Sequence, residues 1–543
     1  MPERGIAETA LAKGQYLAVP VERDSTALSL SLSYEAAQRR IAGCRDKGRA
    51  FLFAKQITVL AAAVVGLSGC MVGPNFHQPD APATSRYTEG TLPPETVSAA
   101  GTGGAAQRFV PGDLPAQWWS LYRSEPLEGL VREALADSPT LSAARATLRQ
   151  AQENLVARTG ALMYPAVDAS ASASRQKISN ATIGEPGASL FNLYNASIDV
   201  SYMLDIFGGN RRQLEALQSL VDYQGYQLEG AHLALTSNIV TTAILEASLR
   251  AQLKATRDIL AAEEETVRRV QRQYELGGAA RLDLVSVKSQ AAQTAATIPP
   301  LESALAQARH LLAVLVGRLP SEASLPEFDL DTLHLPEDLP VSLPSELARQ
   351  RPDVRAAEAL MHQASAQIGV AEANLYPQVT LTGSFGVEAL EFHRLLAGPG
   401  LWSIAAGVLQ PLFHGGELQA ERRAAIAAYD AAQAQYRETV LQAFRNVADA
   451  LRALEEDART LKAQSDAEAL ARDRLELTRK QFDLGGTSYL ALLDAQRQYA
   501  LARVALVRVQ ANRYADTAAL FQALGGGWWN HEQAASAENP RTN

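Results

Sequence analysis

Few residues of this chain have the types and spacing that chemistry requires. The sequence of 543 residues holds two cysteines and eight histidines. No two histidines stand four residues apart or beside a cysteine, as a zinc site on a helix would need. The glycine-rich phosphate loop, the serine nucleophile elbow and the dinucleotide fingerprint are also missing from the sequence. We therefore expect no catalytic residue, no metal and no cofactor, and we do not expect an enzyme.

One cysteine has a neighbourhood that predicts a modification. Cys70 follows Leu67, Ser68 and Gly69, which resembles the bacterial lipobox, where the cysteine is lipidated and the chain is cut just before it. The apolar stretch over residues 57–69 is shorter than the ~20 residues of a membrane-spanning helix and suits a signal peptide. The sequence predicts cleavage between Gly69 and Cys70 and lipidation of Cys70. The alternative is a chance cleavage site beside an idle cysteine.

The predicted anchor also indicates a location. Residues 1–69 would be an N-terminal extension and a lipoprotein signal peptide. Acyl chains contribute ~0.8 kcal/mol per buried CH₂, so a multiply acylated Cys70 would hold the chain on a membrane without a spanning helix. Met71 stands where an aspartate would indicate retention in the inner membrane. The sequence therefore favours the outer membrane of a Gram-negative cell.

Composition excludes one class of partner. The chain is 47% apolar and 20% charged, which is normal for a folded protein, and its formal net charge is -9. No run of Lys and Arg interleaves with aromatic residues. We expect no nucleic acid partner.

The chain repeats itself. Residues 273–278 (QYELGG) match residues 481–486 (QFDLGG), and Tyr164-Pro165 recurs as Tyr376-Pro377. Landmarks that recur in one order at nearly one spacing predict a tandem duplication. Proline-marked stretches precede and separate the two copies. The predicted organisation after the signal peptide is a lipid-anchored tether (70–115), a first repeat (116–325), a connector (326–345), a second repeat (346–528) and a C-terminal tail (529–543).

The sequence of each repeat predicts a helix, two strands, a very long helix, a Gly-Gly turn and a helix. Residues 417–484 contain no Gly and no Pro, so a continuous helix there would be ~100 Å long. From Val440 to Leu461 apolar residues follow the alternating spacing of a coiled-coil seam. We expect this helix to pack lengthwise on another, with acidic residues such as Glu455 and Glu456 on its solvated face.

Two glycine pairs are expected to close helical hairpins. Gly277 and Gly278 end the long helix of the first repeat, and Gly485 and Gly486 end that of the second. Thr487 or Ser488 can then cap the next helix. Such turns can be purely structural or can be contact points.

Four segments alternate between apolar and polar residues as strands do. They are residues 167–173, 197–204, 378–387 and 402–408. This period is typical of transmembrane barrel strands, although a half-buried soluble sheet gives the same pattern. Four strands cannot close a barrel, so membrane-spanning strands would have to be shared among two, three or more chains. The predicted fold class is an α+β membrane protein with a duplicated helix-strand-strand-helix unit, four strands and long coiled-coil helices per chain.

Several short motifs follow one another along the chain: CMVGP (70–74), WWSL (118–121), RPDVRAAE (351–358), QIGV (367–370), Tyr376-Pro377, QPLFHGG (410–416), LDAQ (493–496) and ALGGGW (523–528). In this order they resemble the outer-membrane factor family, the TolC-like and NodT-like efflux lipoproteins, over residues 70–528. The resemblance implies a homotrimer with a 12-stranded β-barrel and a periplasmic α-helical barrel. It also implies passive conduction from an inner-membrane pump, of the RND type, through a periplasmic adaptor protein, with outer-membrane lipid as a further partner.

The resemblance also assigns candidate site residues. Asp494 matches a position where family members narrow the pore with aspartates, whereas a second acidic position is Ala491 here. Like charges in such a ring would raise one another's pKa values. The hairpin tips at Gly277, Gly278, Gly485, Gly486 and Thr487 are implied adaptor contacts.

Three alternatives stay open at this stage. Asp494 could be an ordinary solvated residue, and Asp199 and Asp205 could face a barrel lumen or simply solvent. The whole protein could be a non-conducting coiled-coil lipoprotein of the envelope, or a periplasmic enzyme with helical arms. The sequence does not identify what would be exported.

Overall fold

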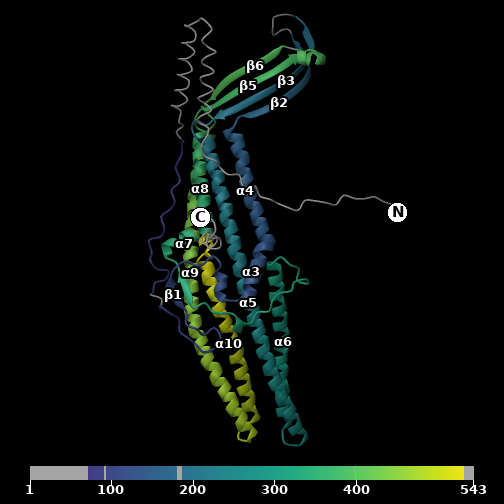
Figure 1. Ribbon diagram of the computed structural model, residues 1–543, viewed down its shortest axis with the longest axis vertical. Helices are drawn as coiled ribbons and strands as arrows, with labels where there is room; N and C mark the ends of the chain where they lie inside the picture. Colours follow the sequence, from purple (N-terminus) through teal and green to yellow (C-terminus); the bar gives the residue numbers. More distant parts are fainter. Residues whose placement is uncertain (1–70, 91–92, 180–185, 398, 531–543) are drawn as a thin grey trace, which may run out of the picture. The chain divides into compact units, whose positions relative to one another are not determined.

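The structure, a computed structural model, describes residues 71–90, 93–179, 186–397 and 399–530 (Figure 1). Gly69 and Cys70, the predicted cleavage and lipidation residues, lie outside the described residues. The helices are α3 (Glu125–Asp137), α4 (Pro139–Met163), α5 (Gly209–Glu275), α6 (Arg281–Leu315), α7 (Pro344–Gln350), α8 (Pro352–Ala373), α9 (Glu417–Asp483) and α10 (Tyr489–Ala523). The strands are β1 (Arg108–Pro111), β2 (Ala166–Ser179), β3 (Ala188–Leu204), β4 (Asp338–Val341), β5 (Gln378–Ala389) and β6 (Gly400–Leu409).

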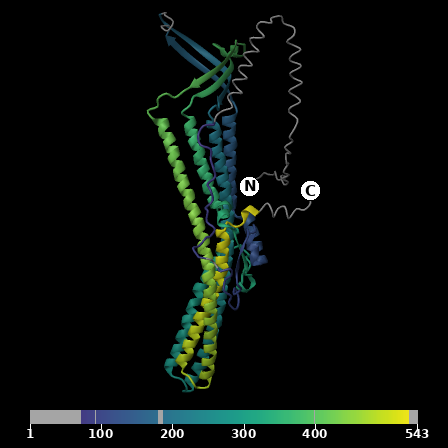
Figure 2. The same cartoon turned by 90° about the vertical axis from the view of Figure 1, so that its left-hand side faces the viewer.

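The two halves have the same order of elements. The first runs α4, β2, β3, α5, α6, and the second runs α8, β5, β6, α9, α10. Helix α5 packs against α4, α6, α8 and α10, and α9 packs against α8 and α10. Figures 1 and 2 show these long helices running side by side, with the strands at one end of α5 and α9 and the hairpin turns at the other. The order of elements predicted for each repeat is therefore observed.

The longest helices have the length that the sequence indicated. Helices α5 and α9 each have 67 residues, so each rises ~100 Å. The seam of α9 packs on α10, with Val447, Leu451 and Leu454 fully buried. The expectation of a solvated face was wrong for Glu455, which is buried. Because two arginines of its own helix, Arg452 and Arg459, bind it at 3.0 and 2.7 Å, its charge is compensated there.

Four strands form one antiparallel sheet in the order β2-β3-β5-β6, so the pairing of β3 with β5 joins the two halves. In its register Ile198 lies opposite Phe385, and Phe385 lies opposite Trp402. Directly opposed residues share a face, so these side chains form one apolar surface. In the single chain Phe385 is 62% and Trp402 73% exposed. The sheet thus presents an uncovered apolar face.

A second sheet was not predicted. Strand β1 pairs in parallel with β4, and these strands come from the segments interpreted as tether and connector. Gln107, next to β1, is fully buried and donates to the carbonyl of Pro336 and the hydroxyl of Thr517. This part of the predicted tether is therefore packed against α10 and the connector.

Motifs that carried the family resemblance meet in the main core. Trp118 packs on Phe521 with ring centroids 5.7 Å apart, and the Trp528 indole donates to the Gln350 carbonyl at 2.6 Å. Arg351 donates to the carbonyl of Ala523 at 2.9 Å, where α10 ends. These motifs therefore have structural roles: they fasten the connecting segments around the middle of the long helices.

Candidate functional site

The two hairpin tips close in the same way. Gly277 and Gly485 have φ values of 76° and 75°, which L side chains rarely adopt. The next glycine donates back across the turn in each: Gly278 to the Gln273 carbonyl at 2.7 Å and Gly486 to the Gln481 carbonyl at 2.8 Å. This is the hydrogen-bond pattern of a Schellman motif, which satisfies carbonyls at a helix end. The repeat in sequence therefore encodes a repeat in turn geometry.

The tips present apolar side chains outward. Leu276 is 86% and Leu484 is 88% exposed. Of the two residues expected to cap α10, Ser488 does so, and its hydroxyl accepts from the Ala491 amide at 3.3 Å. Thr487 is half-buried in the turn before it. Exposed leucines on a rigid turn form a surface that could contact another protein.

The two hairpin tips also pack against each other. Val270 and Val287 of the first hairpin form a small core with Tyr489 of the second, separate from the main core. Phe482 meets Tyr489 edge to face, with ring centroids 4.9 Å apart. Burial raises the pKa of the Tyr489 hydroxyl well above its ordinary value. The two hairpins thus end as one unit.

Asp494 lies on α10, two turns from the second tip, and has a partner that the sequence did not reveal. Arg474 of α9 donates to its carboxylate at 2.6 Å. This hydrogen bond and the arginine charge lower the pKa of Asp494. In the single chain a cation stands beside the carboxylate, and an opposite charge stabilises its ionised form.

The sheet has a polar face opposite its apolar one. In the register Asp168 lies opposite Asp199, Asp199 opposite Ser384, and Ser384 opposite Ser403. The Ser197 hydroxyl donates to the Asp199 carboxylate at 2.8 Å, and the Ser384 and Ser403 hydroxyls are 2.9 Å apart. Sequence analysis missed Asp168, although its alternation with Val167 and Ala169 gave the signal.

Asp205 is not part of that face. Its carboxylate accepts from the amides of Asn210 and Arg211 at 2.9 and 3.0 Å, at the start of α5. It also accepts from the Arg211 side chain at 3.1 Å. These contacts make Asp205 a helix-capping residue, in keeping with the preference for acidic groups at helix N-termini.

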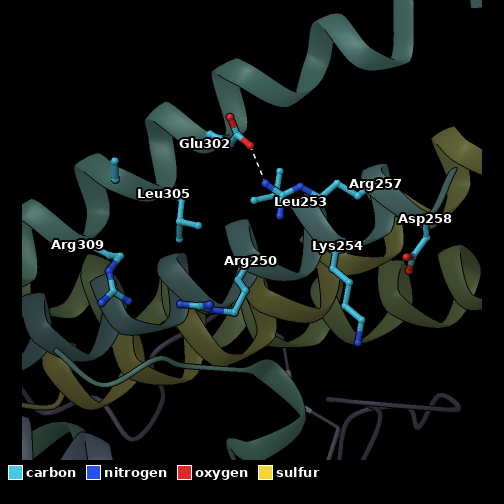
Figure 3. A pocket seen from close by; sticks show the side chains of 9 residues that line it. Arg250, Leu253, Lys254, Arg257, Asp258, Glu302, Leu305 and Arg309 are labelled. Atoms are coloured by element: carbon cyan, nitrogen blue, oxygen red, sulfur yellow. Dashed lines mark hydrogen bonds and ion pairs between the residues drawn. The ribbon is translucent and has the colours of Figure 1, made fainter. Parts of the chain in front are cut away.

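A hollow of about 500 Å³, lined by charged and apolar side chains, lies between α5 and α6 (Figure 3). Arg257 of α5 binds Glu302 of α6 at 2.6 Å across it. Arg250 and Arg309 both bind the buried Glu246, at 2.6 and 3.0 Å. The ion pairs Arg257–Glu302 and Arg309–Glu246 tie the two helices together beside the hollow. They do not form an acid-base pair or a nucleophile with its base.

Among the described residues, no three His, Cys, Asp or Glu side chains gather as a metal-binding group. None of the helices in these described ranges combines the length and the apolar character needed to cross a bilayer.

Comparison with known proteins identifies the arrangement of two repeats, each with a strand pair and a long hairpin. The family model described as "Outer membrane efflux protein" matches residues 130–318 and 343–526. The chain belongs to the outer membrane efflux protein family. Members of this family and their structural neighbours are channel or efflux proteins and not enzymes.

Relatives in the outer membrane efflux protein family match nearly end to end. The toluene efflux pump outer membrane protein TtgC of Pseudomonas putida is 29% identical over 502 residues, which are 90% of this chain and 99% of TtgC. The pyoverdine export outer membrane protein OpmQ of Pseudomonas aeruginosa is 29% identical over 440 residues, 80% of this chain and 92% of OpmQ. Both are named as outer-membrane components of export systems.

Solved structures of outer-membrane channels have a similar fold. The outer-membrane channel OprN matches with a TM-score of 0.76 and 28% identity, covering 84% of this chain and 100% of OprN. The open state of the Neisseria gonorrhoeae MtrE outer membrane channel matches with a TM-score of 0.72 and 28% identity, covering 84% of this chain and 99% of MtrE. The predicted family, its helix-rich α+β channel fold and its location in the outer membrane with an extension into the periplasm are confirmed.

Proposed function

We propose that this protein is the outer-membrane channel of a tripartite efflux system. It passively conducts small molecules, such as drugs or other toxic compounds, from an inner-membrane pump of the RND type and a periplasmic adaptor protein to the exterior. One observation carries the proposal: a sheet with one apolar and one polar face continues directly into helices ~100 Å long. This combination suits a water-filled conduit that begins in a bilayer and extends beyond it.

The sheet supports a shared barrel. Strands β2 and β6 are its outer strands, so each has a side without a partner among the described strands. In hydrocarbon each unsatisfied backbone group costs several kcal/mol, so the edges of separate chains must pair. Three chains would supply twelve strands, with Phe385 and Trp402 toward lipid and Asp199 and Ser384 toward the lumen. The long helices of the three chains would continue the lumen as a helical barrel.

The partners are assigned to the far end of the helices. The exposed Leu276 and Leu484 stand on turns whose shape is fixed by Gly277 and Gly485. A rigid apolar tip is suited to contact an adaptor protein. In this arrangement the pump supplies the free energy, and the chain acts as the conduit.

Asp494 is the proposed gate residue. Its position near the tip of α10 would place three carboxylates around the narrow end of the helical barrel. Arg474 is within reach of the same carboxylate and would compete with a cation from solution. Gating would then depend on whether Asp494 is paired with Arg474 or free to bind a cation in the pore.

Cys70 is the proposed attachment point of the acyl chains, after cleavage behind Gly69. This assignment rests on the sequence around Cys70. Mass spectrometry of the mature N-terminal peptide would detect the lipid as added mass on the fragment that begins at residue 70. An unmodified fragment, or one that begins elsewhere, would contradict the assignment.

Single-channel recording tests the conduit. The purified mature protein should form long-lived conducting pores in planar bilayers. Absence of any conductance from correctly folded protein would overturn the channel and favour a structural envelope lipoprotein.

The gate is tested separately with a matched pair of variants. Asp494→Asn should weaken block by divalent cations or raise the resting conductance. Asp473→Asn removes the same charge from an exposed position of α9 and should leave both unchanged. Arg474→Ala should act in the opposite direction to Asp494→Asn, because it frees the carboxylate. Unchanged traces for Asp494→Asn would exclude Asp494 from the gate while leaving the channel in place.

A further inference from the structure

The beginning of the described chain is not a loose leader. Met71 lies against the loop between β3 and α5, so closely that a Cβ on Gly208 would come within 2.9 Å of the Met71 Cα. The Val72 amide donates to the carbonyl of Phe207 in that loop at 3.1 Å. The residues that follow Cys70 therefore lie where the strands end and the long helices begin.

Arg212, on the first turn of α5, is the centre of this contact. Its side chain is only 1% exposed. The guanidinium donates to the Val72 carbonyl at 3.1 Å, the Gly73 carbonyl at 3.2 Å and the Asn75 side chain at 2.8 Å. Its remaining nitrogen binds Glu215 at 2.7 Å. A buried guanidinium must keep its partners, because leaving such a charge unpaired is strongly unfavourable.

Two glycines allow this segment to approach α8 and Arg212 closely. Gly73 has φ +89°, and a Cβ there would lie 2.4 Å from the Cα of Gly369 in α8. A Cβ on Gly369 would in turn lie 2.7 Å from the Arg212 side chain. Close approach of this kind requires glycine at both positions. The surface formed by Arg212 and Gly369 therefore accepts glycine at position 73 and excludes any residue with a side chain there.

The contact continues along α8. Phe76 stacks on His362 with ring centroids 4.3 Å apart, and His362 lies 2.9 Å from Glu215 of α5. Gln78 donates to Glu358 at 3.2 Å. Residues 72–78, called the docked segment below, are thus bound to α5 of the first repeat and to α8 of the second.

We propose that Arg212 is a positioning residue: by holding the docked segment, it fixes the lipid anchor at the junction between sheet and helices. Cys70 is two residues from Val72, so its reach is at most ~7 Å. Acyl chains on Cys70 would enter the bilayer at one height relative to the ends of the strands. The anchor would thereby set how deeply the sheet lies in the bilayer. The docked segment would hold α5 of the first repeat and α8 of the second together at that level. This inference rests on the proposed lipidation of Cys70.

Hydrogen-deuterium exchange on the mature protein in lipid nanodiscs tests the inference. The Val72 amide, which donates to the Phe207 carbonyl, should be protected in the wild type. Gly73→Ala and Arg212→Gln should each speed its exchange by about tenfold or more, while the seam of α9 stays protected. Gly90→Ala is the matched control, because a Cβ at Gly90 meets nothing within 4 Å. Arg212→Lys keeps the charge without the planar fork and should give an intermediate rate.

Amide exchange tests the docked segment, and conductance tests the proposed channel. Free-peptide exchange of the Val72 amide in the wild type, or its full protection in Gly73→Ala, would overturn the inference. Gly73→Ala changes no helix residue, so it remains informative if Arg212→Gln fails to fold. Conductance of the same samples is scored separately, and its absence would overturn the proposed channel without altering the exchange result.

Discussion

Reversing the character of one sheet face gives the sharpest test of how the strands are oriented. Phe385 is in the middle of β5, between Ile198 and Trp402 in the register, and is 62% exposed in the single chain. In the proposed barrel this side chain faces lipid. Phe385→Arg would place a guanidinium near the centre of the hydrocarbon region.

The expected effect is large because it occurs in each copy. An arginine on the lipid face of a barrel costs ~2–4 kcal/mol near the bilayer midplane, so a trimer would lose roughly 6–12 kcal/mol. Net stabilities of folded proteins are ~5–15 kcal/mol. Phe385→Arg should therefore abolish most of the assembled protein in the outer membrane.

The control is the adjacent residue. Successive side chains of a strand point to opposite faces, so Ser384→Arg introduces the same group on the polar face, opposite Asp199 and Ser403. This variant should assemble and should reduce cation current through the pore. Outer-membrane fractionation with unheated gels measures assembly, and planar bilayers measure the current. Normal assembly of Phe385→Arg, or failure of Ser384→Arg alone, would refute the assignment of the two faces.

Three further changes test local features, all by unfolding of the mature protein in detergent. Gly485→Ala should lower stability by ~1–2 kcal/mol, because its φ of 75° opposes a side chain although space is open, whereas Gly486→Ala should have a smaller effect. Burial and the neighbouring Asp516 raise the pKa of Asp457 to about 8. Its ordinary value is ~3.9, so the folded state holds an extra proton between about pH 4 and pH 8 and stability falls as pH rises through that window. Asp457→Asn cannot ionise and should flatten this fall; an unchanged slope between pH 5 and pH 8 would contradict the assignment. Replacing Pro299 and Pro300, both exposed inside α6, by alanine should raise stability by up to ~3 kcal/mol each, and a lower unfolding midpoint would show that the prolines are needed.

Features with a local cause could be predicted from the sequence. The extent of α9 follows from a stretch without Gly or Pro, and its seam follows from the spacing of Val447, Leu451 and Leu454. The turn at Gly485 follows from the glycine pair at a helix end. Each of these features depends on residues near one another in the chain, so a local sequence pattern is enough to predict it.

Features with a distant cause could not be predicted. Strand β1 has only four residues, and its partner β4 is more than 200 residues away and contains Pro340. The burial of Glu455 depends on the helices α8 and α10 that pack against α9, although its two arginine partners are near in the sequence. Arg212 reads in the sequence as an ordinary charged residue of a helix start. Its role emerges only when the segment after Cys70 lies against it.

The central claim is that one chain is an incomplete conduit whose sheet edges must be paired by identical chains. The most direct measurement is the mass of the mature protein in a detergent micelle, by light scattering coupled to size exclusion, with the detergent contribution subtracted. The account predicts a protein mass three times that of one chain, together with circular dichroism that includes a strand contribution. A stable single-chain species that retains the folded sheet would contradict it.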